Sequence, residues 1–160
     1  AFSHMPDKKL VVIGDGSDMK KIKAKATSNI EILGYQPNSV MEEHMRNAKA
    51  FIFAAEEDFG ITPVEAQACG TPVIAFGKGG SLETVRPLGV DMPTGMFFEQ
   101  QNISSLISAV NLFTENQYSF EPVNCRDNAL KFSVERFKNE MSNYVFQKWD
   151  HFQKSKTVTY

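Results

Sequence analysis

Short apolar segments alternate with amphipathic ones through residues 1–100, and this alternation constrains the fold more than any other feature of the sequence. The apolar segments are rich in Val, Ile and Phe and lie at residues 9–14, 30–34, 50–55, 72–76 and 95–98. Runs of this kind are typical of strands buried on both faces of a parallel sheet. The segments between them have the spacing of helices, which indicates βαβ units. We therefore predict an α/β fold with a doubly wound, mostly parallel sheet and a ligand site at the carboxyl ends of its strands.

From Asn102 onward the pattern predicts helices alone. One stripe of apolar side chains recurs there at spacings of three and four: Val134, Phe137, Met141, Tyr144, Val145, Trp149 and Phe152. We interpret this stripe as part of the core, with a seam for another domain as the alternative. The organisation that we predict is a single domain at residues 1–153, followed by a frayed tail at residues 154–160.

Composition and charge exclude several classes of protein. A chain of 160 residues that is 42% hydrophobic can bury one core. The net charge of −2 and the pI of about 5.9 lack the basic footprint of a nucleic-acid-binding protein. Cys69 and Cys125 form no metal-type cluster, so we expect reduced thiols in a cytoplasmic protein, with Cys69 buried. There is no run of 18 apolar residues and no signal-peptide pattern, which predicts a chain that neither spans a membrane nor is exported.

A helix is predicted to begin immediately after the third apolar segment. A polar loop at residues 56–60 follows that segment, and then Thr62 is a candidate N-cap, with Pro63 at the first helical position. The start of this helix would lie at the carboxyl end of a strand, with the N–H groups of Gly60, Ile61 and Thr62 nearby. Such a helix start is an anion-binding site.

Two carboxylates flank this turn, and each has two interpretations. Glu65 stands three residues after Thr62, so it can complete a capping box, or it can bind a ligand. Glu57 belongs either to a solvated acidic loop or to the ligand site. No His or Cys lies close to these acids, so we expect no metal.

The stretch "EEDFGITPVEAQACGTPVIAFGKGGSLETV" closely resembles the signature of retaining glycosyltransferases of family 4, which have the GT-B fold. In that signature two glutamates bracket a Phe-Gly turn. The resemblance extends over residues 9–98 and includes "KLVVIGDG", "IEILGYQ" and "TGMFF". Its wording is most similar to bacterial mannosyltransferases that build cell-surface polysaccharide.

The resemblance implies a role for each matching residue. Glu57 would bind hydroxyls of the donor sugar and act as the catalytic residue, and Glu65 would accept from the ribose hydroxyls of the nucleotide. Backbone N–H groups at Phe59, Gly60, Ile61 and Thr62 would bind the sugar and the diphosphate. The other donor-binding positions that it implies are Gly14, Gly16, Gly34, Tyr35, Gln36, Gly79 and Gly80. For Gly14, Gly16 and Gly34, the alternative is that glycine serves only a tight turn between a strand and a helix. For Gly79 and Gly80, the alternative is the start of a helix capped by Ser81.

The resemblance also implies the reaction and the partners. The expected activity is retaining transfer of a hexose, with mannose from GDP-mannose favoured, to a lipid-linked or oligosaccharide acceptor in polysaccharide or lipopolysaccharide synthesis, without a metal cofactor. A UDP-sugar donor, or a non-catalytic nucleotide-binding domain, is the alternative. In the family, an arginine and a lysine that clamp the diphosphate precede the segment matched here, as does the N-terminal acceptor domain. We therefore expect most of a donor-binding half, inactive alone, from an enzyme that is cytoplasmic or peripherally attached to the inner face of the membrane.

Overall fold

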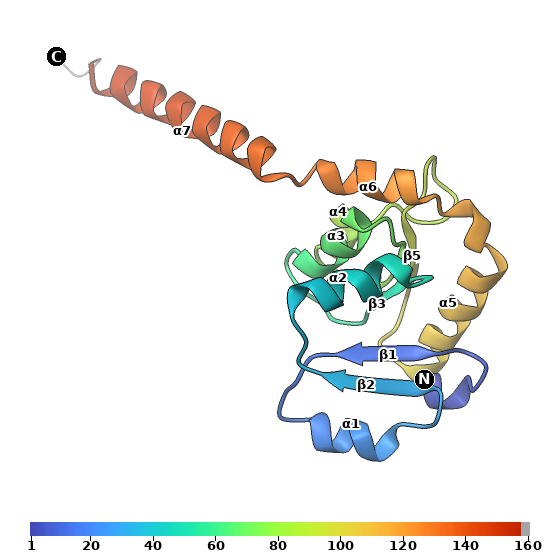
Figure 1. Ribbon diagram of the computed structural model, residues 1–160. Coiled ribbons are helices and arrows are strands. Elements are labelled where there is room, and N and C mark those ends of the chain that lie inside the picture. The colour runs from blue at the N-terminus through green and yellow to red at the C-terminus, as the bar shows by residue number, and fades with distance from the viewer. Residues whose placement is uncertain (158–160) are drawn as a thin grey trace.

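The computed structural model describes residues 1–157, and its strands lie where the sequence predicts them. Figure 1 shows an α/β body from which one long helix projects. The strands are β1 (Leu10–Ile13), β2 (Ile30–Gly34), β3 (Phe51–Phe53), β4 (Val73–Phe76) and β5 (Gly95–Phe98). Every pair of hydrogen-bonded strands is parallel. The α/β class and the parallel pairing are confirmed.

Helices connect these strands and follow the last of them. They are the 3-10 helices η1 (Phe2–His4) and η2 (Gln117–Ser119) and the α-helices α1 (Met19–Lys25), α2 (Asn38–Asn47), α3 (Ile61–Ala68), α4 (Ser81–Thr84), α5 (Ile103–Glu115), α6 (Pro122–Leu130) and α7 (Val134–Thr157). The predicted helical character after Asn102 is confirmed. None of the helices in the described part of the chain has the length and apolar character needed to cross a membrane.

Hydrogen bonding divides the strands into two sheets. One sheet has the order β1-β2 and the other has the order β3-β4-β5. Within residues 1–157, no strand pairs with the edge of β1 opposite β2 or with the edge of β3 opposite β4. The strands of the first sheet are only partly buried, whereas all four residues of β4 are buried. The expected buried parallel sheet is therefore complete only around β4.

The core lies on both faces of β4. Ile74 and Phe76 point to one face, where they pack with α5 and with the N-terminal Phe2. Val73 and Ala75 point to the other face, against α2 and α3. Alternate residues of one strand thus serve two helical layers, as expected for a doubly wound sheet (Figure 1).

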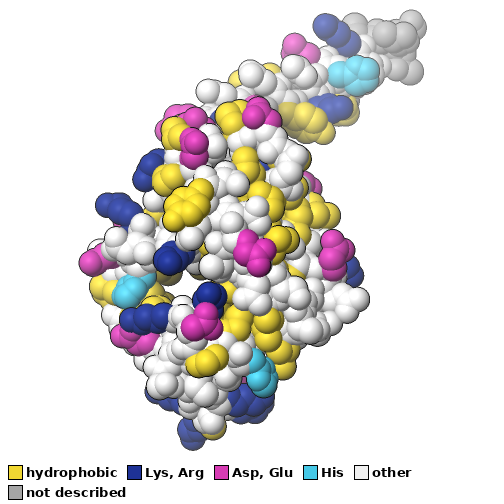
Figure 2. Space-filling view, turned by 90° about the vertical axis from the view of Figure 1, so that its right-hand side faces the viewer, with side chains coloured by type: hydrophobic (Ala, Val, Ile, Leu, Met, Phe, Trp, Pro, Cys, Tyr) yellow, Lys and Arg dark blue, Asp and Glu magenta, His cyan; other side chains and the backbone are white. Residues whose placement is uncertain are grey.

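The apolar stripe of α7 is not part of this core. Phe137 is 61% exposed and Trp149 is 57% exposed, and the other stripe residues are exposed as well. Figure 2 shows hydrophobic side chains along the projecting arm. The interpretation of the stripe as core is wrong, because α7 leaves the body instead of packing on it. The helix also includes residues 154–157 of the predicted tail, while residues 158–160 lie outside the described residues.

Candidate functional site

The turn between β3 and α3 is built around Gly60. Its φ of 78° lies in the left-handed region that favours glycine, and it is the N-cap residue of α3, which begins at Ile61. A side chain would also be tight here, since a Cβ atom on Gly60 would lie 3.3 Å from the ring of Phe53. The predicted N-cap Thr62 and the capping box with Glu65 are wrong, because no side chain caps α3. The chain enters the helix earlier than predicted, since Gly60 makes the sharp turn.

The loop after β4 meets the loop after β3. The backbone N–H of Gly80 donates to the carbonyl oxygen of Glu57 over 2.8 Å. A Cβ atom on Gly79 would lie 2.3 Å from that same oxygen, and one on Gly80 would lie 2.3 Å from the Cα atom of Phe59. No side chain fits at such distances, so the close approach of the two backbones explains why both positions are glycine. Ser81 is not a cap, since its buried Oγ atom has no hydrogen-bond partner among the described residues.

The backbone at this junction offers hydrogen-bond donors that an anion could use. The first-turn N–H groups of Ile61 and Thr62 have no carbonyl partner inside the helix, and the positive end of the helix dipole lies there. Lys78 adds a positive charge in the loop next to Gly79, with its Nζ atom 5.6 Å from the centre of the Phe76 ring. The sequence reasoning missed Lys78, although its place in the glycine-rich loop was a signal.

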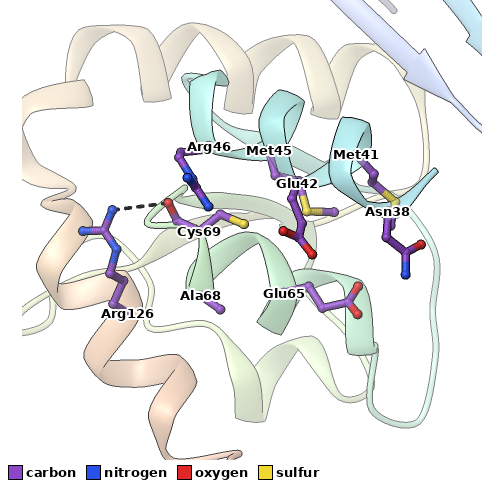
Figure 3. Close-up of a pocket in the computed structure, with 9 residues that line it drawn as sticks. All are labelled: Asn38, Met41, Glu42, Met45, Arg46, Glu65, Ala68, Cys69 and Arg126. Atoms are coloured by element: carbon purple, nitrogen blue, oxygen red, sulfur yellow. Dashed lines mark hydrogen bonds between the residues drawn. The ribbon is translucent and has the colours of Figure 1, made fainter. Parts of the chain in front are cut away.

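Glu65 lines a cavity of about 490 Å³ between α2 and α3, and Glu57 is not among the residues that line it. Figure 3 shows side chains from these two helices facing each other across it. The lining residues are Asn38, Met41, Glu42, Met45, Arg46, Glu65, Ala68, Cys69 and Arg126. The sequence reasoning missed the α2 residues, although their spacing of three and four places them on one helix face.

The remaining predicted positions form a second group, at the carboxyl ends of β1 and β2. The N–H of Gly14 donates to the carbonyl oxygen of Gly34 over 2.8 Å, and the N–H of Gly16 donates to the side chain of Asp15. Tyr35 is 82% exposed, whereas the amide of Gln36 donates to the carbonyl oxygen of Leu33. No hydrogen bond within residues 1–157 connects this group to the loops of Glu57 and Gly80.

The two cysteines are free and differ in their surroundings. Cys125 is 0% exposed, and burial raises the pKa of its thiol to about 11. Cys69 is only partly buried and lines the cavity, so its predicted burial is wrong. Burial also raises the pKa of the Cys69 thiol. Among the described residues, no three His, Cys, Asp or Glu side chains are grouped so that they could hold a metal ion.

Comparison with known proteins identifies the family. Residues 1–132 match the family described as glycosyl transferases group 1, and the chain belongs to this family. It is 32% identical over 112 residues to the GDP-mannose-dependent monoacylated alpha-(1-6)-phosphatidylinositol monomannoside mannosyltransferase of Corynebacterium glutamicum, covering 63% of this chain and 28% of that protein. It is 28% identical over 156 residues to the poly(glycerol-phosphate) alpha-glucosyltransferase of Bacillus subtilis, covering 89% of this chain and 21% of that protein.

Solved structures show the same fold. Sucrose-phosphate synthase from Thermosynechococcus elongatus superposes with a TM-score of 0.78 at 21% identity, over 94% of this chain and 41% of that one. Anabaena HepE in complex with UDP and glucose superposes with a TM-score of 0.73 at 19% identity, over 90% of this chain and 42% of that one. The chain thus spans less than half the length of each of these relatives.

Proposed function

We propose that this chain binds a nucleotide diphosphate sugar at the carboxyl ends of its strands, as the donor-binding part of a retaining glycosyltransferase. The observation that carries the proposal is the meeting of the Glu57 and Gly80 loops at the first turn of α3. This arrangement brings the backbone of Glu57, an exposed acidic residue, close to the unpaired N–H groups at the start of α3. A sugar diphosphate needs both, since its hydroxyls donate hydrogen bonds and its phosphates accept them.

Each predicted residue then has a chemical task. The Glu57 carboxylate accepts hydrogen bonds from hydroxyls of the donor sugar. The N–H groups of residues 59–62 bind the diphosphate, which gains negative charge as it leaves. Glu65 accepts from the vicinal ribose hydroxyls, and the cavity beside it holds the nucleoside. Residues 14–16 and 34–36 border the same crevice, with Tyr35 and Gln36 toward the base.

The reaction that we propose is attack by the acceptor on the same face of the sugar from which the diphosphate leaves. The acceptor oxygen forms a bond to the anomeric carbon, the bond to the diphosphate breaks, and the acceptor proton passes to the leaving phosphate. The protein positions the groups and stabilises the developing charge. No metal is part of this proposal.

GDP-mannose is the donor that we favour, and the acceptor would be lipid-linked or an oligosaccharide. The donor and lipid acceptor named for the Corynebacterium glutamicum relative support this choice. A UDP-sugar is the second candidate, because HepE, which shares the fold, is known in complex with UDP. We also propose that the full enzyme acts in polysaccharide or lipopolysaccharide synthesis in the cytoplasm, with peripheral attachment to the inner face of the membrane.

A second domain and one further strand would complete the enzyme. The order of the strands here, β2-β1 and then β3-β4-β5, corresponds to the doubly wound order 3-2-1-4-5-6 with its first strand left out. The exposed stripe of α7 supports an acceptor domain that would cover it. If so, acrylamide should readily quench the fluorescence of Trp149 in this chain. Hydrogen exchange along α7 should be slower in the full-length enzyme than in this chain, and equal exchange rates in the two would contradict the proposal.

The donor proposal is tested by NMR titration of this chain with GDP, UDP, ADP and GDP-mannose at millimolar concentration. We expect selective weak binding of one nucleotide, and loss of that binding in Glu65→Ala. The matched control is Glu43→Ala, which removes an exposed carboxylate from α2 outside the cavity lining. Both variants should keep the stability of the parent, because Glu65 does not cap α3. A Glu65→Ala variant that loses about 1 kcal/mol of stability but binds normally would mean that Glu65 is a cap after all.

A further inference from the structure

A buried hydrogen-bond network lies behind the candidate site and connects it to α6. Gln67 of α3 is 0% exposed, and its Nε2 atom donates to the carbonyl oxygens of Pro63 over 3.1 Å and Thr84 over 2.9 Å. Asn128 of α6 is 4% exposed, and its Nδ2 atom donates to Oε1 of Gln67 and to the carbonyl oxygen of Thr84, both over 2.8 Å. Pro63 lies in the first turn of α3 and Thr84 ends α4. The network therefore holds the two short helices that follow the Glu57 and Gly80 loops.

The side-chain amides in this network have partners for their donors and acceptors. The amide nitrogens of Gln67 and Asn128 each donate two hydrogen bonds. The Oδ1 atom of Asn128 accepts a further one from Nζ of Lys131 over 3.3 Å. Apolar side chains can pack two helices together in many registers, whereas a satisfied buried network allows few. Such a network specifies one relative placement of α3, α4 and α6.

A ring contact connects the same region directly to the site turn. Phe59 lies edge to face against Phe132, with the ring centres 5.5 Å apart and an angle of 68° between the planes. Phe132 follows α6 and precedes α7, and it is only partly buried. The residues just after α6 thus restrain the turn that carries Glu57 and Gly60.

We propose that Asn128 and Phe132 are positioning residues of the donor site. Asn128 acts through Gln67 and Thr84, and Phe132 acts through Phe59, so that neither residue touches the ligand. They hold the two loops at a fixed distance indirectly, through the elements that carry these loops. The hydrogen bond from Gly80 to Glu57 joins the loops directly. This inference rests on the proposed function, since it assigns the placement of the loops to donor binding.

The first arm of the test measures the loops without any ligand, in Asn128→Leu and Phe132→Leu. Asn128→Leu removes both donors and keeps the branched shape and the number of heavy atoms of the side chain, and Phe132→Leu removes the ring but keeps an apolar side chain. Hydrogen exchange of the Gly80 amide, which is bonded to Glu57, should accelerate at least fivefold relative to the Ile74 amide of β4. General loss of stability would accelerate both amides together. Phe132→Tyr, which keeps the ring, should restore the slow exchange.

The second arm measures the Kd for the nucleotide selected by the titration above. We expect an increase of at least fivefold in both leucine variants, while Phe132→Tyr and the control Asp127→Ala stay within twofold of the parent. Asp127 is an exposed neighbour of Asn128 on α6. Unchanged Gly80 exchange in folded Phe132→Leu and Asn128→Leu would overturn the proposal, as would unchanged binding. If the parent chain binds no nucleotide, the proposed function fails, and the exchange arm still decides whether these residues position the loops.

Discussion

Gly80 donates its backbone N–H to the carbonyl oxygen of Glu57 over 2.8 Å, so two loops that are separated by a helix and a strand share one hydrogen bond. The contact places the backbone of Glu57 beside a glycine-rich loop, close to the first turn of α3. Neither loop can move far without the other. This coupling is what makes the Glu57 side chain a candidate for a fixed role, since an isolated acidic loop would be solvated and mobile.

Gly80→Ala should disrupt this contact. The φ of Gly80 is −62°, which alanine adopts without strain, so the effect comes from space alone. The new Cβ atom would lie 2.3 Å from the Cα atom and 2.4 Å from the carbonyl oxygen of Phe59. We expect a loss of about 1–3 kcal/mol in the free energy of unfolding. Urea unfolding measures it.

Gly16→Ala is the matched control for this substitution. A Cβ atom there meets nothing within 4 Å, and the φ of Gly16 is not positive. Its stability should stay within about 0.5 kcal/mol of the parent, or rise slightly because alanine restricts the unfolded chain. Equal losses in both variants would mean that Gly80 does not pack against Phe59.

Glu57→Gln should lower turnover in the full-length enzyme and leave folding intact. The amide keeps the size of the side chain but accepts hydrogen bonds at only one atom and carries no charge. We expect kcat to fall by at least tenfold, with a thermal unfolding temperature equal to that of the parent. Glu56→Gln, at the neighbouring exposed acid, should leave kcat unchanged. Equal turnover in Glu57→Gln and the parent would remove Glu57 from the site.

The sequence predicted the strands, and the loops that follow β3 and β4, better than the helix ends. Buried strands such as residues 72–76 have an apolar pattern that is decided locally, and the Phe-Gly turn carries its own conformational signal. The predicted start of α3 was wrong because Gly60 and Thr62 are both plausible N-cap residues. The choice between them depends on how the turn packs in the folded chain. The α7 stripe was wrong for another reason, since periodicity shows that a helix has an apolar face but not what covers it. The cavity beside Glu65 depends on the packing of α2 against α3, which no local pattern reports.

The buried thiol of Cys125 predicts a loss of stability at alkaline pH. Its pKa is raised by burial to about 11 from an ordinary value of 9.0. Between these values the unfolded chain releases the thiol proton and the folded chain keeps it, so stability falls as the pH rises. From pH 8 to pH 10.5 the expected loss from this group is about 2 kcal/mol.

Urea unfolding of the parent and of Cys125→Ala at both pH values measures this loss. The other titrating groups are common to the two proteins, so their contributions cancel in the difference. The variant should be less stable than the parent at pH 8, and the gap should narrow by about 2 kcal/mol at pH 10.5. A gap that is independent of pH would mean that the thiol ionises equally in the folded and unfolded chains.

The exposed face of α7 predicts that a large aromatic side chain there contributes little to the stability of this chain. Phe146 is 68% exposed, whereas Phe113 of α5 is 5% exposed and stacks on Phe120 with the ring centres 5.1 Å apart. Phe113→Ala should cost about 3–5 kcal/mol in the free energy of unfolding, as core phenylalanines do, and Phe146→Ala less than about 1 kcal/mol. Urea unfolding of the two variants compares identical substitutions in the two environments. A large loss in Phe146→Ala would show that α7 packs on the body of this chain in solution instead of projecting from it.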